Sequence, residues 1–163
     1  MKNLNDSLFS SKDHTWETPK EFFEYLDSYF NFDLDVCAVQ ATAKCEKFFS
    51  PEEDGLAQNW EGMCWMNPPY GREQIKWIKK AYEEFKNETG KVVCLIPARP
   101  DTKVWQDVIF KNASAVCFIK GRLKFGGSKD SAPFPSALVV FNNDISEEQI
   151  EALKVLGQTF VMN

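Results

Sequence analysis

The strongest constraint on the fold is an uninterrupted apolar run, Val-Val-Cys-Leu-Ile at 92–96, which soon follows a segment with helical periodicity at 73–87. A strand whose residues are all apolar is typical of a parallel sheet, because helices cover both faces of such a sheet. The sequence therefore predicts an α/β fold whose sheet is mainly parallel.

Other segments continue this alternation of strands and helices. Strands are predicted at 32–36, 63–67, 115–119 and 137–141, with a short one at 47–49. One helix is predicted to start after Thr18, which is its N-cap, with Pro19 first in the helix and Glu21 in a capping box. Two more helices are predicted at 73–87, with Gly90 as C-cap, and at 101–112. A last helix is predicted after Ser146, with Gln149 in a capping box. The first helix buries an apolar stripe of Phe22, Phe23, Leu26, Tyr29 and Phe30. Without repeats or linkers, we expect residues 1–163 to form one domain, with 1–13 as a flexible N-terminus.

Charge is distributed unevenly along the chain, whose net charge is −5. Residues 1–63 carry 5 basic and 13 acidic groups, whereas residues 72–129 carry 13 basic and 6 acidic groups. The second segment is suited to face phosphates. The alternative is that its lysines only solvate helix faces, and the sequence leaves both interpretations open.

Membrane, secreted and metal-binding classes are disfavoured. The longest apolar runs have five residues, as at 137–141, and the N-terminus lacks the apolar segment of a signal peptide, so we expect a soluble cytoplasmic protein with no membrane partner. The five cysteines form no CxxC pair and His14 is the only histidine, so no metal site is expected. Cys64, Cys94 and Cys117 lie in apolar runs and are predicted to be core residues.

The segment Asn67-Pro68-Pro69-Tyr70 directly follows a predicted buried strand. An aromatic amine such as that of adenine is a poor nucleophile because its lone pair is delocalised into the ring. Two acceptors, the Asn67 side-chain oxygen and the Pro68 carbonyl, can localise that lone pair, and the prolines fix the backbone that aims them. Tyr70 offers a flat face on which a planar group stacks. The structural alternative is a strand that simply ends at two prolines; we favour catalysis by Asn67, Pro68, Pro69 and Tyr70.

Several motifs occur together in a familiar order: Trp-Glu-Thr-Pro at 16–19, Asp-Leu-Asp-Val-Cys-Ala at 33–38, Asp-Gly-Leu at 54–56 with Trp60, and Asn-Pro-Pro-Tyr-Gly at 67–71. Ile-Pro-Ala-Arg at 96–99 and Gly-Arg-Leu-Lys-Phe at 121–125 extend the match to about residues 14–142. This combination resembles the small Dam-like DNA N-6-adenine methyltransferases of phages and prophages. The resemblance implies a Rossmann-like methyltransferase fold and transfer of a methyl group from S-adenosylmethionine to adenine in DNA, without a metal.

The resemblance also implies which residues bind the methyl donor: Trp16, Thr18, Pro19, Asp35, Cys37, Ala38, Asp54 and Asn67. Thr18 and Pro19 match the element that meets the methionine end of the donor, where a helix N-terminus suits a carboxylate. Asp35 ends the first strand, where relatives place an acidic residue. Asp54 matches the residue that accepts a hydrogen bond from the donor's adenine amine, with a turn residue before Gly55 as the structural alternative.

One feature departs from most methyltransferases, which have a Gly-x-Gly loop after the first strand. Here the segment reads Asp-Val-Cys-Ala-Val-Gln-Ala at 35–41 and contains no glycine. Only 26 residues separate Val36 from Met63, too few for two helix–strand units of about thirty residues each. We therefore expect a fold that is abbreviated between the first strand and the Asn67 strand, as in the small Dam-like relatives.

The resemblance implies double-stranded DNA as the partner and flipping of the target adenine out of the duplex. Candidate DNA contacts are Arg72, Arg99, Lys103, Arg122, Lys124 and Lys129. Phe134 either closes the pocket opposite Tyr70 or belongs to the core beside Pro133 and Pro135. A GATC target follows by analogy only. We expect a monomer or homodimer, encoded by a phage or prophage and active in the host cytoplasm.

Two other functions are compatible with parts of the sequence. A methyltransferase that acts on a protein glutamine would meet the same lone-pair problem with the same Asn67–Tyr70 segment, but its relatives usually keep the glycine-rich loop. An inactive nucleic-acid-binding protein would explain the missing Gly-x-Gly, but it would not need an intact Asn67–Tyr70 segment.

Overall fold

A computed structural model describes residues 17–127 and 130–162 of the chain. Its centre is a six-stranded sheet with the strand order β1-β2-β3-β5-β4-β6. The strands are β1 (Leu34–Asp35), β2 (Gly62–Met66), β3 (Gly90–Pro97), β4 (Ala115–Ile119), β5 (Ser136–Phe141) and β6 (Gly157–Val161). The β1–β2 and β2–β3 ladders are parallel, whereas β5 is antiparallel to both β3 and β4, and β6 is antiparallel to β4. Strands β1 to β4 therefore share one direction, which confirms the predicted α/β class.

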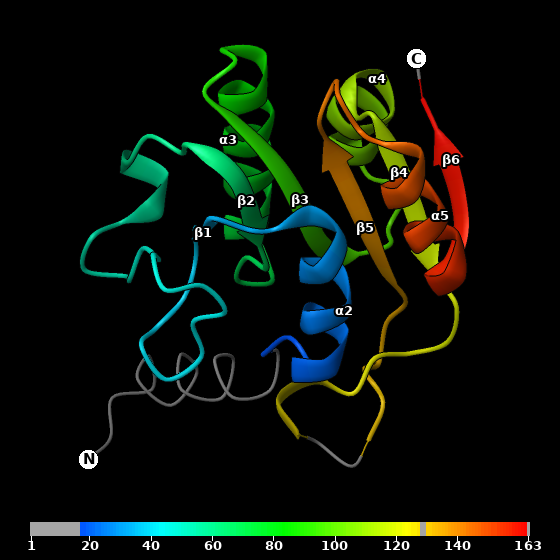
Figure 1. The fold of residues 1–163 in the computed structure, drawn as a ribbon, viewed down its shortest axis with the longest axis horizontal. Coiled ribbons are helices and arrows are strands. Elements are labelled where there is room, and N and C mark those ends of the chain that lie inside the picture. Colours follow the sequence, from blue (N-terminus) through cyan, green and yellow to red (C-terminus); the bar gives the residue numbers. More distant parts are fainter. Residues whose placement is uncertain (1–16, 128–129, 163) are drawn as a thin grey trace.

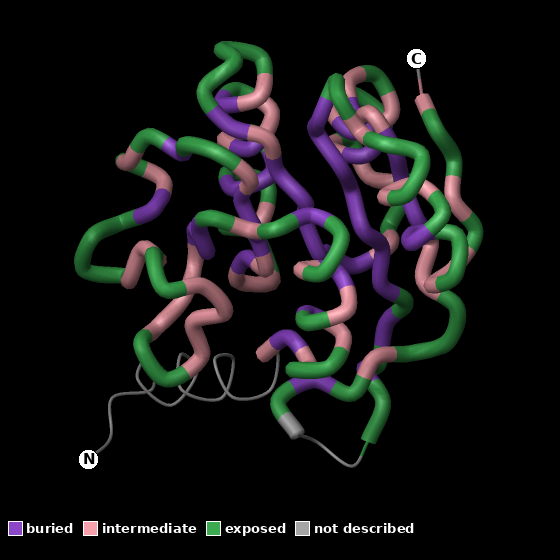
Figure 2. Tube along the Cα trace, viewed as in Figure 1, coloured by how far each residue is buried: buried purple, intermediate pink, exposed green. Residues whose placement is uncertain are grey.

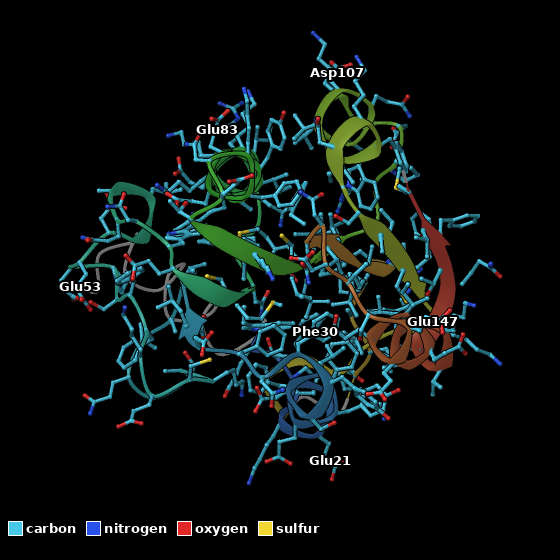
Figure 3. The ribbon with its side chains drawn as sticks, turned by 45° about the horizontal axis from the view of Figure 1, so that its top comes forward. Glu21, Phe30, Glu53, Glu83, Asp107 and Glu147 are labelled. Carbon is cyan, nitrogen blue, oxygen red and sulfur yellow. The ribbon has the colours of Figure 1, made fainter. Side chains whose placement is uncertain are left out.

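Helices cover both faces of this sheet (Figures 1 and 3). Helices α3 (Glu73–Lys86) and α4 (Phe110–Asn112) lie on one side, and α2 (Lys20–Phe30) and α5 (Glu147–Leu156) lie on the other. The Tyr25 hydroxyl of α2 donates a 2.8 Å hydrogen bond to the Ala152 carbonyl of α5, which joins the two helices of that layer.

Strand β3 is buried on both faces, as its composition predicts (Figure 2). Val92, Cys94 and Ile96 belong to a core cluster with Trp77 and Ile78 of α3. The intervening residues of β3 face the opposite layer, where they share a second cluster with Phe23, Leu26 and Phe30 of α2. Because successive strand residues point to opposite faces, one strand supplies both hydrophobic cores. The predicted core cysteines of β2, β3 and β4 are all buried.

Local signals predicted the last helix correctly. Ser146 accepts a hydrogen bond from the Gln149 backbone N–H, and the Gln149 side chain accepts one from the Ser146 N–H, which completes the capping box. The first helix differs from the prediction. It starts at Lys20 with Pro19 as N-cap, and no side chain caps it, so the capping box of Thr18 and Glu21 is wrong.

Four further predictions need correction. Gly90 does not end α3, since Glu88 adopts the left-handed conformation (φ 61°) and Gly90 begins β3, where a Cβ would lie 2.7 Å from the Trp60 carbonyl oxygen. The helix expected at 101–112 contains a π-helical turn over Trp105–Ile109. Tyr29, predicted to face inward, is 39% exposed. The proposed strand at 47–49 is reduced to one bridge between Phe48 and Asp35.

The carboxyl ends of β1 to β4 meet at the lower edge of the sheet in Figure 1, because these strands share one direction. The described parts of the segment between β4 and β5, residues 120–127 and 130–135, run along the same edge. No helix within residues 17–127 and 130–162 is long and apolar enough to cross a membrane. The predicted flexible segment 1–13 lies outside the described residues.

A substitution at Gly55 tests how tightly residues 50–60 pack against this sheet. A Cβ atom there would collide with the Val36 carbonyl oxygen and lie 2.8 Å from the Trp77 ring. We expect Gly55→Ala to lower the free energy of unfolding in urea by about 1–3 kcal/mol, because buried residues would have to shift. The control, Ala57→Ser, changes an exposed residue of the same turn and should alter stability by less than about 0.5 kcal/mol. Equal stabilities of the two variants would contradict this packing.

Candidate active site at the carboxyl ends of the strands

A cavity of about 320 Å³ lies at the carboxyl ends of β1 and β2. It brings together nine residues predicted from sequence: Thr18, Asp35, Cys37, Ala38, Asp54, Asn67, Pro68, Pro69 and Tyr70. We call it the first cavity. Pro19 is not among its lining residues, and Trp16 lies outside the described part of the chain.

Asn67 is the first residue after β2, and its side chain is bound by a residue of the segment that precedes α2. Its amide nitrogen donates a 2.9 Å hydrogen bond to the Thr18 hydroxyl oxygen, 49 residues away in sequence. Thr18 is only 2% exposed. The hydroxyl predicted to cap α2 therefore binds Asn67 instead, and this bond sets the orientation of the Asn67 amide group.

Asp35, at the end of β1, organises the segment that replaces a glycine-rich loop. Its carboxylate accepts backbone N–H groups from Cys37 (3.3 Å) and Lys44 (3.0 Å), so the chain between them curves around the cavity. The Asp35 side chain is almost completely buried. Burial raises its pKa to about 7, although the two N–H donors and the nearby Lys44 charge act in the opposite direction.

Asp54 lies in a tight turn at the cavity wall. It adopts the left-handed conformation (φ 54°), and its carboxylate accepts a 3.2 Å hydrogen bond from the Leu56 backbone N–H. The Trp60 indole donates to the Gly55 carbonyl at 2.8 Å and stacks on Trp77, with ring centroids 6.1 Å apart. Asp54 is thus a turn residue, as one interpretation held, and it also lines the cavity, as the other requires.

Other cavity residues were not predicted from sequence. Glu17 and Leu56 lie inside the motifs at 16–19 and 54–56 but received no role there. No motif contains the remaining ones, which include Lys44, Phe49, Glu73 and Trp77. Lys44 is paired with Glu17 at 3.2 Å. Acidic side chains outnumber basic ones around the cavity, since Lys44 is the one basic residue among its described lining residues. The described lining therefore contains more carboxyl groups than basic groups.

Tyr70 lines the first cavity and also a second cavity of about 530 Å³. Its ring contacts Phe134 at 5.1 Å and Phe125 at 6.4 Å between centroids. Phe134 is 8% exposed and lines the second cavity, so it is both a core residue and a wall beside Tyr70. Burial raises the pKa of the Tyr70 hydroxyl, which keeps it neutral.

Basic residues predicted to contact DNA occupy the same edge of the sheet. Arg99 and Lys103 line the second cavity and are exposed, as are Arg72 and Lys124. Arg122 donates a hydrogen bond to the Ala132 carbonyl at 3.2 Å, which braces the segment between β4 and β5. Lys129 lies outside the described residues. Within the described ranges, no cluster of three His, Cys, Asp or Glu side chains is placed to hold a metal.

Comparison with known proteins identifies the family. Residues 6–156 match the family described as DNA N-6-adenine-methyltransferase (Dam). The chain belongs to this family. It is 36% identical over 150 residues to the DNA N-6-adenine-methyltransferase of Haemophilus phage HP1, covering 86% of this chain and 85% of that protein. It is 35% identical over 111 residues to the enzyme of the same name from Escherichia phage T1, covering 66% of this chain and 45% of that longer protein.

The buried Asp35 carboxyl predicts a pH dependence of stability. Its pKa is about 7 in the folded protein against an ordinary value of 3.8. Between these two pH values the folded state therefore keeps a proton that the unfolded state has lost. The stabilisation is fully present below about pH 4 and is lost as the pH rises through 7. We expect the free energy of unfolding to fall across this window, relative to Asp35→Asn, by at most about 1.4 kcal/mol per pH unit.

Urea unfolding at a series of pH values measures this difference. The control is Asp101→Asn, which removes an exposed carboxyl after β3 and should leave the wild-type pH profile unchanged. Parallel profiles for wild type and Asp35→Asn would contradict a raised pKa at Asp35.

Proposed function

We propose that this protein is a site-specific DNA adenine N6-methyltransferase that uses S-adenosylmethionine. The observation that carries the proposal is the Asn67 amide, which Thr18 holds in a fixed orientation where β2 ends at the first cavity. Family membership supports the reaction, and the strand order supports an abbreviated Rossmann-like methyltransferase fold.

The first cavity fits S-adenosylmethionine in its chemistry. The donor carries a sulfonium and an ammonium group, and the cavity is lined by Glu17, Asp35, Asp54 and Glu73. Phe49 and Trp77 supply aromatic surface for its adenine ring. When bound, the donor supplies an electrophilic methyl group. We assign the donor site to Thr18, Asp35, Cys37, Ala38, Asp54 and Asn67, while Trp16 and Pro19 stay predictions from sequence.

Asn67 and Pro68 act on the acceptor amine. The Asn67 side-chain oxygen and the Pro68 carbonyl accept the two hydrogens of the adenine N6 amine, which localises its lone pair for attack on the methyl group. Pro68 and Pro69 restrict the backbone that places these acceptors. Tyr70 stacks on the base, and its neutral hydroxyl adds no charge to the site.

The acceptor base reaches Tyr70 from the second cavity, whose rim carries Arg99 and Lys103. A base inside a duplex cannot enter, so the target adenine is flipped out while Arg72, Arg99, Lys103 and Lys124 hold phosphates. Arg122 contributes through the segment it braces, and Lys129 stays a sequence-based candidate. The enzyme acts on double-stranded DNA in the bacterial cytoplasm, as a monomer or homodimer.

The test is transfer of labelled methyl from S-adenosylmethionine to unmethylated duplex DNA, followed by digestion to nucleosides. We expect label in N6-methyldeoxyadenosine. Label in a bulk protein extract, with none in DNA, would instead identify a protein glutamine methyltransferase. An inactive nucleic-acid-binding protein would show no transfer and no thermal shift with S-adenosylhomocysteine, which should stabilise a functional enzyme by about 2.7 kcal/mol at 100 times its dissociation constant.

In the same assay, we expect Asn67→Ala to abolish transfer, because one of the two acceptors for the amine is lost, while the thermal shift with S-adenosylhomocysteine persists. The matched control, Asn59→Ala, removes an exposed amide just before β2 and should keep wild-type activity. Near-normal turnover of Asn67→Ala would contradict the catalytic assignment.

Thr18 provides a separate test of how Asn67 is oriented. Thr18→Val keeps the shape but removes the acceptor for the Asn67 amide. We expect kcat to fall roughly tenfold to a hundredfold, because a misaligned catalytic group loses the reactive geometry. Thr18→Ser keeps a hydroxyl and should recover most of the rate, and a wild-type kcat for Thr18→Val would exclude this positioning role.

A further inference from the structure

The second cavity contains a buried polar group that the proposed mechanism does not use. Gln74 lies in the first turn of α3, four residues after Tyr70, and both residues line this cavity. The Gln74 side-chain nitrogen is buried and has no hydrogen-bond partner among residues 17–127 and 130–162. Buried amide donors are almost always paired, because an unpaired one loses its hydration without compensation. Because Gln74 lines the cavity, an acceptor on a ligand there would give this donor the partner that it lacks.

The surroundings of Gln74 indicate which acceptor fits. The cavity walls include the rings of Tyr70, Phe134 and Trp105, and the last two side chains are buried. The cations Arg99 and Lys103 are exposed, so they suit phosphates outside the cavity rather than a group within it. A flat, uncharged base fits between aromatic walls. Its unprotonated ring nitrogens are acceptors, and amide side chains commonly pair with adenine through such a nitrogen.

We propose that Gln74 is a base-recognition residue whose side-chain amide donates a hydrogen bond to a ring nitrogen of the flipped adenine. The inference rests on the proposed function, since it assigns the second cavity to the acceptor base. Asn67 and Pro68 hold the exocyclic amine, and Gln74 contacts the ring. The acceptor is N1, N3 or N7, and the experiment separates the three.

The experiment compares wild type with Gln74→Met, which removes the donor at similar size. Substrates are duplexes that contain adenine, 1-deazaadenine, 3-deazaadenine or 7-deazaadenine, where each analogue replaces one ring nitrogen by C–H. For one of the three analogues, replacing adenine should lower the kcat/KM of wild type about tenfold more than it lowers the kcat/KM of Gln74→Met. On adenine itself, Gln74→Met should lose about tenfold in kcat/KM, and it should lose nothing further on that one analogue, since the contact is already absent.

A stability measurement separates recognition from a structural role. Because the Gln74 nitrogen is unpaired in the folded protein, Gln74→Met should keep or raise Tm while it lowers activity. Gln74→Glu, which replaces the same nitrogen by an acceptor, provides a second variant should methionine disturb the fold. The control Gln158→Met changes an exposed amide on β6, at the opposite edge of the sheet from β1, and should leave both quantities unchanged.

Two results would overturn the proposal. Wild-type activity of both Gln74 variants would mean that only water meets this amide. An equal loss by the variants on all four substrates would mean that Gln74 does not contact a ring nitrogen. Failure of the proposed function looks different, because wild type itself would then form no N6-methyldeoxyadenosine.

Discussion

Two consecutive prolines at the end of β2 determine where everything else in the site lies. Pro68 and Pro69 have no N–H to donate, so the parallel ladder with β3 ends at the pair Met66 and Cys94. The chain leaves the sheet there, and Asn67 lies at the edge where β1 also ends, since Asp35 pairs with Trp65. An amide and a carboxylate 32 residues apart in sequence thus line one cavity.

The cavity wall is built without a glycine-rich loop because a buried carboxylate takes over its organising role. A glycine loop brings backbone N–H groups close to a ligand. Here the Asp35 carboxylate draws the N–H groups of Cys37 and Lys44 toward itself, while its backbone pairs with Lys47 and Phe49. The segment therefore keeps its shape through hydrogen bonds to one strand end. Its contacts with a ligand must come mainly from side chains, which explains the acidic and aromatic lining.

Sequence reasoning succeeded where the determinant is local or repeated. The apolar run of β3 predicted a sheet covered on both faces, and Ser146 with Gln149 predicted a helix start, because these signals involve residues within a few positions. Thr18 was assigned to a cap, since nothing nearby reveals that its hydroxyl binds Asn67 from 49 residues away. Strand β6 was missed because it is a short, half-exposed edge strand whose one partner among the described strands is β4.

The distinction between local signals and long-range contacts also applies to the residues of the site. Motif residues from 18 to 70 do converge on the first cavity, but Gln74 and Lys44 belong to no motif, and only the packing of distant segments reveals their positions. The sequence left two interpretations open for Asp54 and for Phe134, and the structure is compatible with both, since each residue has a structural contact and also lines a cavity.

The amine-binding pair that we propose, Asn67 and Pro68, would not by itself choose adenine, since cytosine and a glutamine side chain also present an NH₂ group. Discrimination requires contacts to the rest of the acceptor, and a polar group left unpaired by the wrong acceptor discriminates more strongly than an apolar wall does. Within the described residues, the sheet and its covering helices provide two places for such contacts: the exposed cations at the strand ends and the walls of the second cavity. In the proposed function the cations contact phosphates, which every DNA sequence carries. On the proposed mechanism, choice of the base therefore depends on the cavity beside Tyr70, where the aromatic rings would select a flat acceptor and the Gln74 amide of α3 would select its hydrogen-bonding edge.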